Sequence, residues 1–180
     1  MIEFELNRQD VRDIERILQK FKGDDIVRCI VRATNRAAVH ARKVGLQEIG
    51  KIYAIKTNQV RKQAAIRDEM LGTTIHVKGH MIPIANGSTG EIVQYKGKVQ
   101  AKGIFVQVKK GSGSLVPRSF DHGGRFFART SKKRFPIKGL YGPSVPQLFG
   151  NPDVMDAMEE AGMDMYEKRL EHELDRLIGG

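Results

Sequence analysis

The segment from Lys132 to Phe149 restricts the fold of this chain more than any other part of the sequence. It contains Pro136, Pro143 and Pro146, and each proline fixes its own φ angle, lacks a backbone donor and disfavours a helical conformation in the residue before it. Two glycines between these prolines add conformational freedom. The pattern predicts an extended arm that is neither a helix nor a central strand, with side chains such as Tyr141 available to dock on a partner.

Charge is distributed unevenly along the 180 residues, which carry a net charge of +10. Residues 26–138 hold 23 Lys and Arg against 5 Asp and Glu, whereas residues 1–25 hold 5 against 7 and residues 139–180 hold 3 against 9. The basic middle has three interpretations: a surface that faces phosphates, a surface that meets the acidic end of a neighbouring subunit in a ring, or an ordinary solvated surface. Net charge does not choose between them, because it concerns association and not fold.

Length and composition indicate one soluble domain that spans residues 1–180. Cys29 is the only cysteine, which excludes an intrachain disulfide, suits a reducing compartment and is typical of a small core residue. The first residues lack a signal-peptide pattern, and no apolar run is long enough to cross a membrane. The sequence therefore predicts a protein that is made in the cytoplasm and has no membrane partner.

Two long helices are predicted, one over residues 24–50 and one over residues 153–178, and a short strand and a helix are expected before residue 23. On the helix over residues 24–50, an alanine-rich apolar stripe lies opposite a basic stripe. The basic stripe consists of Arg28, Arg32, Arg36 and Lys43. It is either a surface for phosphates or a partner, or the solvated side of an amphipathic helix. On the last helix the apolar stripe changes side, so that helix either kinks near Gly162 or packs its two halves on different surfaces.

After Gly72 the sequence changes to short β-branched and aromatic runs that are bounded by glycines, which predicts an antiparallel sheet with several hairpins. Thr57 is expected to cap a short helix that includes Ala64 and Ala65, and residues 86–101 are expected to form a mobile loop or a long hairpin. The complete prediction is an α+β fold, in which N-terminal helices and a long C-terminal helix pack on an antiparallel sheet. Its parts are residues 1–65 (mainly helical), 66–138 (antiparallel sheet), 139–152 (extended Pro/Gly arm) and 153–178 (C-terminal helix).

Residues 125–138 combine six basic residues with three phenylalanines and no acid. Such a composition occurs where single-stranded nucleic acid stacks on aromatic rings. Phe126 and Phe127 are adjacent, however, and adjacent side chains point to opposite faces of a strand. The favoured interpretation places the phenylalanines in the core and the cations outside.

Each pattern that could indicate catalytic, metal-ligating or cofactor-binding residues has an ordinary structural explanation. His76 and His80 stand four residues apart in the context of a strand and a turn, whereas a metal site needs three or four convergent ligands. Residues 121–124, with the sequence Asp-His-Gly-Gly, are typical of a tight hairpin turn. The sequence therefore predicts no enzyme, no cofactor and no metal.

The arm begins with Arg134-Phe-Pro-Ile and continues with Gly142-Pro-Ser-Val-Pro before the last helix. This arrangement resembles the phage minor tail protein Z family, whose members carry an R-x-P-I step and then GPSVP before a final helix. The resemblance covers most of the chain as a pattern and is specific in the arm and the helix after it. It implies a structural virion protein that completes the head-proximal end of a long phage tail. Such a protein forms a ring on the tail tube and takes part in head–tail joining.

The resemblance also implies partners: other copies of the chain in a homohexameric ring, the tail tube protein, a head-completion or neck protein, and a non-specific contact with genomic DNA. The implied subunit or partner contacts are Phe135, Pro136, Tyr141, Pro143, Val145, Pro146, Leu148 and Phe149. The basic residues expected to face DNA or a partner are Arg28, Arg32, Arg36, Lys43, Lys132, Lys133 and Arg134. Two alternatives stay open: a neck adaptor between portal and tail, and a sequence-independent DNA-binding protein that uses the basic helix face.

Overall fold

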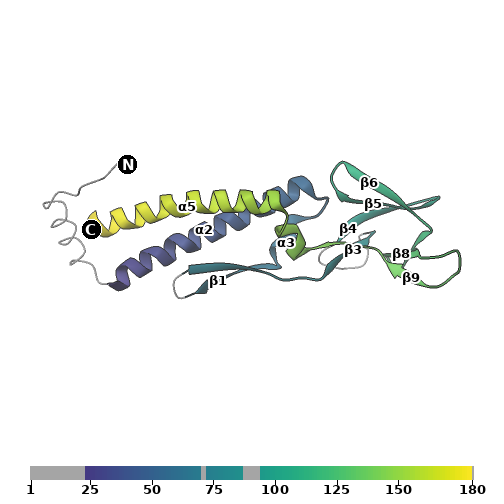
Figure 1. Cartoon of the computed structure of the whole chain (residues 1–180), viewed down its shortest axis with the longest axis horizontal. Coiled ribbons are helices and arrows are strands. Elements are labelled where there is room, and N and C mark those ends of the chain that lie inside the picture. Colours follow the sequence, from purple (N-terminus) through teal and green to yellow (C-terminus); the bar gives the residue numbers. More distant parts are fainter. Residues whose placement is uncertain (1–22, 70–71, 87–93, 180) are drawn as a thin grey trace, which may run out of the picture.

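The computed structural model describes residues 23–69, 72–86 and 94–179, which form an elongated molecule (Figure 1). Two long helices lie side by side at one end, and the strands of the main sheet gather at the other end (Figure 1). The fold is α+β, as the sequence predicts. The strand and the helix predicted before residue 23 lie outside the described residues.

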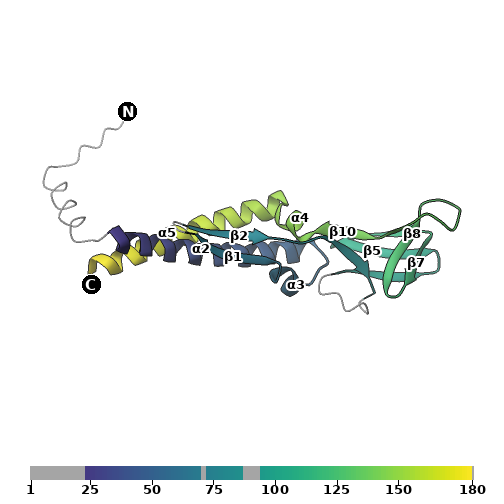
Figure 2. The ribbon, with the colours of Figure 1, turned by 90° about the horizontal axis from the view of Figure 1, so that it is seen from below.

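Helices α2 (Gly23–Ile52) and α5 (Pro152–Gly179) pack against each other in antiparallel directions (Figures 1 and 2). The alanine-rich stripe of α2 favours this arrangement, because small side chains let two helices approach closely. Ala33 and Ala41 of that stripe are buried, and a methyl group on Gly45 would overlap the side chain of Met158 in α5. The two long helices predicted from the sequence are confirmed.

Helix α5 is continuous through Gly162. A methyl group at this glycine would lie 3.4 Å from Cβ of Ala41, so Gly162 is a point of close approach to α2. The apolar stripe changes side because the two halves of α5 have different neighbours. The first half joins the main core, where Val154 is fully buried. The last half lies against α2, where the thiol of Cys29 donates to the carbonyl of Glu173 at 3.7 Å.

A short helix and a hairpin follow α2 and lie along it (Figure 2). They are α3 (Thr57–Arg61), β1 (Ala64–Glu69) and β2 (Gly72–Val77). The predicted short helix is confirmed in place but is wrong in extent, because Ala64 and Ala65 belong to β1 and pair with β2. Thr57 is not its cap: Lys56 occupies the N-cap position, and no side chain caps the helix. The helix is held instead by Val60, which is fully buried.

The main sheet has eight strands within the described residues, in the order β6-β5-β4-β3-β8-β7, with β9 paired to β8 and β10 paired to β3. Their bounds are β3 (Met81–Ala85), β4 (Tyr95–Gln100), β5 (Gly103–Lys109), β6 (Ser112–Pro117), β7 (Ser119–His122), β8 (Arg125–Arg129), β9 (Ile137–Gly139) and β10 (Tyr141–Ser144). The described pairs are antiparallel, as predicted, except that β3 and β4 run parallel, with Ile84 opposite Tyr95. Residues 86–101 contain β4, which forms a hairpin with β5, so the prediction of a mobile loop is wrong over this strand.

The prediction of an extended conformation is also wrong for the short helix α4 (Val145–Phe149). Pro146 lies in the first turn of α4, where its missing N–H would have no partner within the helix in any case. The residue before the helix, Ser144, is extended, and its N–H donates to Oε1 of Gln147 at 2.8 Å. This contact is the reciprocal half of a capping box, and the Ser-x-x-Gln spacing that signals it is present in the sequence.

One core joins the helix pair to the sheet, and α4 lies between them (Figure 2). Its largest fully buried side chains are Tyr95, Phe126, Ile49, Ile104, Leu148, Val60, Val145 and Val154. Two glycines leave room for the rings: a methyl group on Gly97 would overlap the ring of Phe126, and one on Gly142 would overlap the ring of Tyr95. The core therefore depends on close packing between strands β4, β8 and β10.

The buried hydroxyl of Tyr95 makes the stability of the chain sensitive to alkaline pH. Its hydroxyl donates to the carbonyl of Pro143 at 3.2 Å, and burial, with a smaller effect of Tyr53, raises the pKa of Tyr95 well above its ordinary value. At pH values just above the ordinary tyrosine pKa of about 10, the folded chain therefore keeps the proton of the Tyr95 hydroxyl, whereas the unfolded chain loses it. The stabilisation is thus complete below the unfolded pKa of about 10 and is lost as the pH rises toward the folded pKa.

Tyr95→Phe removes this titration, so we expect a flatter dependence of stability on pH in the variant. Above about pH 10, the free energy of unfolding of the wild type should fall by up to about 1.4 kcal/mol more per pH unit than that of Tyr95→Phe. Urea unfolding at several alkaline pH values measures the two slopes. The other tyrosines and the lysines titrate in both proteins, so their contributions cancel in the comparison, and equal slopes would contradict a protonated buried Tyr95.

Candidate functional site

The predicted contact residues of the arm separate into a buried group and an exposed group. Val145, Leu148 and Phe149 are only 0%, 0% and 6% exposed, because the capped helix α4 turns them into the core of their own chain. This corrects the expectation that they are available for docking on a neighbour. Phe135 and Tyr141, by contrast, are 63% and 49% exposed.

The arm is part of the sheet and does not reach away from it. Strand β9 pairs with β8, and β10 pairs with β3. Between them, the N–H of Leu140 donates to the carbonyl of Phe126 at 2.8 Å, and the carbonyl of Leu140 accepts from the N–H of Ile84 at 3.0 Å. The backbone of the arm is therefore fixed by hydrogen bonds on both sides.

Three exposed apolar side chains remain on this backbone, and we call Phe135, Ile137 and Tyr141 the apolar strip. Ile137 is 39% exposed. The ring of Tyr141 covers Gly139, since a methyl group on that glycine would lie 2.7 Å from Cε2 of the ring. Among the prolines of the arm, Pro136 and Pro146 are exposed and Pro143 is half-buried. Large apolar side chains held on a rigid surface are suited to a protein contact.

A second apolar surface is a groove of ≈ 450 Å³ where α2, β2, α4 and α5 meet, which we call the apolar groove. It is lined by Ala41, Ile75, Val77, Pro146, Phe149, Gly150, Met155, Met158 and Glu159. Met155 is 54% exposed, and methionine adapts its shape to an apolar partner. The sequence did not indicate this groove, because its walls come from three parts of the chain that are far apart: α2, β2 and the consecutive helices α4 and α5.

The basic stripe of α2 lies beside an acidic helix of the same chain. Arg28, Arg32, Arg36 and Lys43 are all exposed. Arg28 forms an ion pair with Asp25 at 3.8 Å, and Arg32 pairs with Glu173 of α5 at 3.2 Å. Because α5 holds nine acidic residues against three basic ones, it lowers the attraction of this surface for phosphates. The arrangement favours the interpretation of the stripe as the solvated side of a helix.

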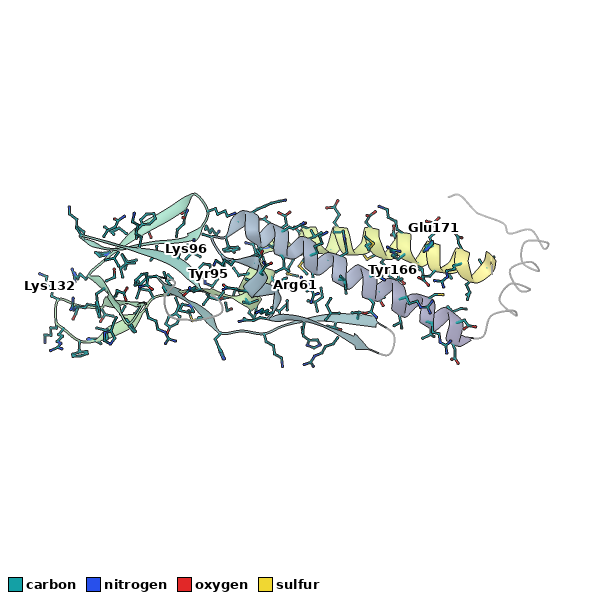
Figure 3. All side chains as sticks on the ribbon, turned by 180° about the vertical axis from the view of Figure 1, so that it is seen from behind. Arg61, Tyr95, Lys96, Lys132, Tyr166 and Glu171 are labelled. Atoms are coloured by element: carbon teal, nitrogen blue, oxygen red, sulfur yellow. The ribbon has the colours of Figure 1, made fainter. Side chains whose placement is uncertain are left out.

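The structure divides the basic middle of the sequence into two different surfaces. Helices α2 and α5 together hold 9 Lys and Arg against 12 Asp and Glu, whereas residues 95–138 of the sheet end hold 12 Lys and Arg against a single acid, Asp121. Figure 3 shows Lys132 at the tip of the sheet end and Glu171 on α5 toward the opposite end of the molecule. The uncompensated positive charge is therefore concentrated on the sheet.

Lys132, Lys133 and Arg134 lie in the exposed loop between β8 and β9. Two of them border a hollow, which we call the basic hollow and which is lined by Arg118, Arg129, Ser131, Lys132 and Arg134. The sequence prediction missed Arg118 and Arg129, because they join the loop only through the pairing of β7 with β8.

Within the described residues, His76 and His80 are not joined by a third metal-ligating side chain. His76 and His80 line a shallow hollow together with three cations, Lys62, Arg67 and Lys78, and no carboxylate is among its described lining residues. Across residues 23–69, 72–86 and 94–179, no group of three or more His, Cys, Asp or Glu side chains is placed to hold a metal ion. His122 is elsewhere, on β7, where its ring contacts the edge of a phenylalanine ring at 6.4 Å between centroids.

Another hollow, of ≈ 510 Å³, lies between α3 and β4. Its lining consists of Ala54, Ile55, Lys56, Gln59, Asn86, Gln94, Lys96, Gly97 and Lys110. These residues include no hydroxyl, thiol, imidazole or carboxylate group. The described lining therefore holds no hydroxyl or thiol nucleophile and no His, Asp or Glu general base, and its only ionisable side chains are three lysines.

Comparisons with known proteins leave the function to be inferred from the molecule itself. No protein-family model, curated protein or solved structure matches this chain. None of the helices in the described ranges combines the length and the apolar character needed to span a bilayer. The apolar strip, the apolar groove and the basic hollow are therefore the features from which a function is proposed.

Proposed function

We propose that this chain is a structural virion protein that completes the head-proximal end of a long phage tail. In this role it forms a ring on the tail tube and takes part in head–tail joining. The tail role comes from the resemblance of residues 134–146 to the minor tail protein Z family. The observation that carries an assembly role is the apolar strip, whose three side chains are 39–63% exposed within that same segment.

A closed ring requires each subunit to present two different surfaces that fit each other. The apolar strip at the sheet end and the apolar groove beside α5 are two such surfaces. In the proposed assembly, Phe135 and Tyr141 contact the neighbouring subunit or the tail tube, and the buried Leu148 holds α4 and the arm in place. The proposed partners are further copies of the chain in a hexamer, the tail tube protein and a head-completion or neck protein.

A neck adaptor between portal and tail is the closest alternative, because an adaptor would use the same exposed apolar surfaces. It differs in its target, since an adaptor binds portal-bearing heads without a tail. A DNA-binding protein that uses the basic face of α2 has less support. Arg32 already pairs with Glu173, and the acidic α5 lies beside the stripe.

The purified chain should bind to one tip of tails that were assembled without it. We expect saturable binding of a fixed, small number of copies, measured by co-sedimentation with quantitative gels and by negative-stain imaging of the tips. Binding along the whole tail, or no binding, would contradict tail completion. Binding to tail-free heads alone would favour the neck adaptor instead of the tail-completion protein.

The double variant Phe135→Ala/Tyr141→Ala tests the contact surface. We expect its binding to tails to weaken by about tenfold or more, because exposed aromatic anchors carry a large share of the energy of a protein contact. Its stability should change little, since both side chains are exposed. The matched control is Met163→Ala/Ile178→Ala, which removes two side chains of α5 that are 55% and 58% exposed. The proposal about the strip fails if the double variant binds tails as the wild type does, or if the control loses binding equally.

A further inference from the structure

The tail proposal leaves the basic hollow at the tip of the sheet unused. This hollow has a volume of ≈ 450 Å³, and four of its five lining residues are cations: Arg118, Arg129, Lys132 and Arg134. The fifth is Ser131, so no acid is among the described residues that line it. Such a site attracts a negatively charged ligand.

Paired strands bring two of these arginines together. In the pairing of β7 with β8, Ser119 lies opposite Ala128, and the N–H of Arg129 donates to the carbonyl of Arg118 at 3.2 Å. The guanidinium of Arg129 lies over the ring of Phe120, 4.9 Å from its centroid. This cation–π contact restricts a side chain that would otherwise be flexible. Arg118 has a φ of 58°, which a residue other than glycine rarely adopts, so the tight bend before β7 is a specific feature of the fold.

The loop after β8 supplies the opposite wall and is organised by its own hydrogen bonds. The N–H and the hydroxyl of Thr130 donate to the carbonyl of Pro136 at 3.2 and 3.1 Å. The N–H of Lys133 donates to Oγ of Ser131 at 3.2 Å. The backbone of the loop therefore holds Lys132 and Arg134 at the hollow.

The composition of the hollow indicates phosphate groups as its ligand. Three of the four cations are arginines, and the planar guanidinium fits two phosphate oxygens at once. The surrounding residues 95–138 hold 12 basic residues against one acid, so the positive field extends well beyond a single phosphate. A polymer with many phosphates makes use of that whole surface, whereas an isolated phosphate would use only the hollow.

We propose that the basic hollow is a sequence-independent binding site for the backbone phosphates of double-stranded DNA. The aromatic rings beside the hollow are already in contact with its arginines, which disfavours the stacking of single-stranded bases. Phe120 lies under Arg129 and stacks on Phe127 at 6.1 Å between centroids, and one face of the exposed Phe135 lies under the guanidinium of Arg134, 5.7 Å from the ring centroid. An acidic segment of a protein is the competing ligand class. The inference goes beyond tail completion, because the isolated chain should bind DNA whether or not it docks on tails.

The experiment compares two variants of the full chain that remove the same amount of charge. Lys132→Gln/Arg134→Gln removes two of the four cations of the hollow, and Arg28→Gln/Arg36→Gln removes two exposed cations of the stripe on α2. Binding of each protein to a short fluorescein-labelled DNA duplex is measured by fluorescence anisotropy between about 50 and about 200 mM salt. Circular dichroism confirms that each variant is folded, and Lys132→Gln alone is the fallback if the double variant is not.

We expect the wild type to bind with a strong dependence on salt. Removing these two cations of the hollow should raise the Kd by about tenfold and lower the salt slope by about 2, while the α2 variant should bind nearly as the wild type does. Three results would overturn the proposal: no DNA binding at about 50 mM salt, equal weakening by both variants, or greater weakening by the α2 variant. Displacement of the DNA by polyglutamate at an equal concentration of charges would also overturn it and assign the site to an acidic protein segment.

Discussion

Phe126→Ala is expected to lower the free energy of unfolding by about 3–5 kcal/mol. Phe126 is 1% exposed, and its ring fills the space above Gly97 of β4, which Ile84 of β3 also borders. Strands β3, β4 and β8 are hydrogen-bonded in the order β4-β3-β8. Their spacing is therefore fixed, and they cannot approach one another to close the cavity that the ring would leave. Urea unfolding followed by circular dichroism measures the loss.

Phe127→Ala is the matched control, because it removes the same side chain from the next position of the same strand. Phe127 is only partly buried and stacks on Phe120 on the opposite face of β8. The expected loss is smaller, about 1–2 kcal/mol. If the two variants were equally destabilised, the assignment of Phe126 to the core and Phe127 to the outer face would be wrong.

Leu148→Ala is expected to lower the free energy of unfolding of the isolated chain by about 2–5 kcal/mol. Leu148 is fully buried in α4, which contacts α2, α5, β2 and β10. A cavity at this position would weaken the connection between the helix pair and the sheet. The loss should therefore appear as a lower midpoint in denaturant for the chain alone, in the absence of any partner.

Tyr141→Ala provides the contrast within the same segment. Tyr141 is 49% exposed, so its removal should cost the isolated chain less than about 1 kcal/mol. Both residues carry the same expectation in the sequence, namely a contact with a partner. The structure predicts that only Tyr141 can have that role. A Leu148→Ala chain that kept the stability of the wild type and lost only tail binding would restore the sequence-based expectation.

The parts of the fold that local patterns encode could be predicted. The boundaries of α2 and α5 follow from helical periodicity and from Asp24 and Pro152 in their first turns. The separation of Phe126 and Phe127 between two faces follows from the alternation of side chains along a strand. The burial of Cys29 at 4% exposure likewise agrees with its position at the border of the apolar stripe.

The candidate sites were predicted less completely. The exposure of Phe135 and Tyr141 agrees with a contact role, but the helix α4 reverses the role expected for Leu148 and Phe149. The prolines of the arm were correct indicators of restricted backbone, although they did not show which restricted conformation each part adopts. Pro146 is compatible both with an extended arm and with a first helical turn, and the contact of Gln147 with Ser144 favours the turn.

The sequence by itself determined the α+β composition, the two long helices, the alternating faces of the strands and the excess of positive charge. These properties depend on residues within a few positions of each other, so they are readable along the chain. Only the tertiary structure decided that the arm returns to its own sheet, that the basic stripe of α2 lies beside the acidic α5, and that Arg118 and Arg129 join the loop at Lys132. Each of these depends on contacts between distant segments, whose free energy includes the cost of closing the intervening chain and the packing of elements that no local pattern specifies.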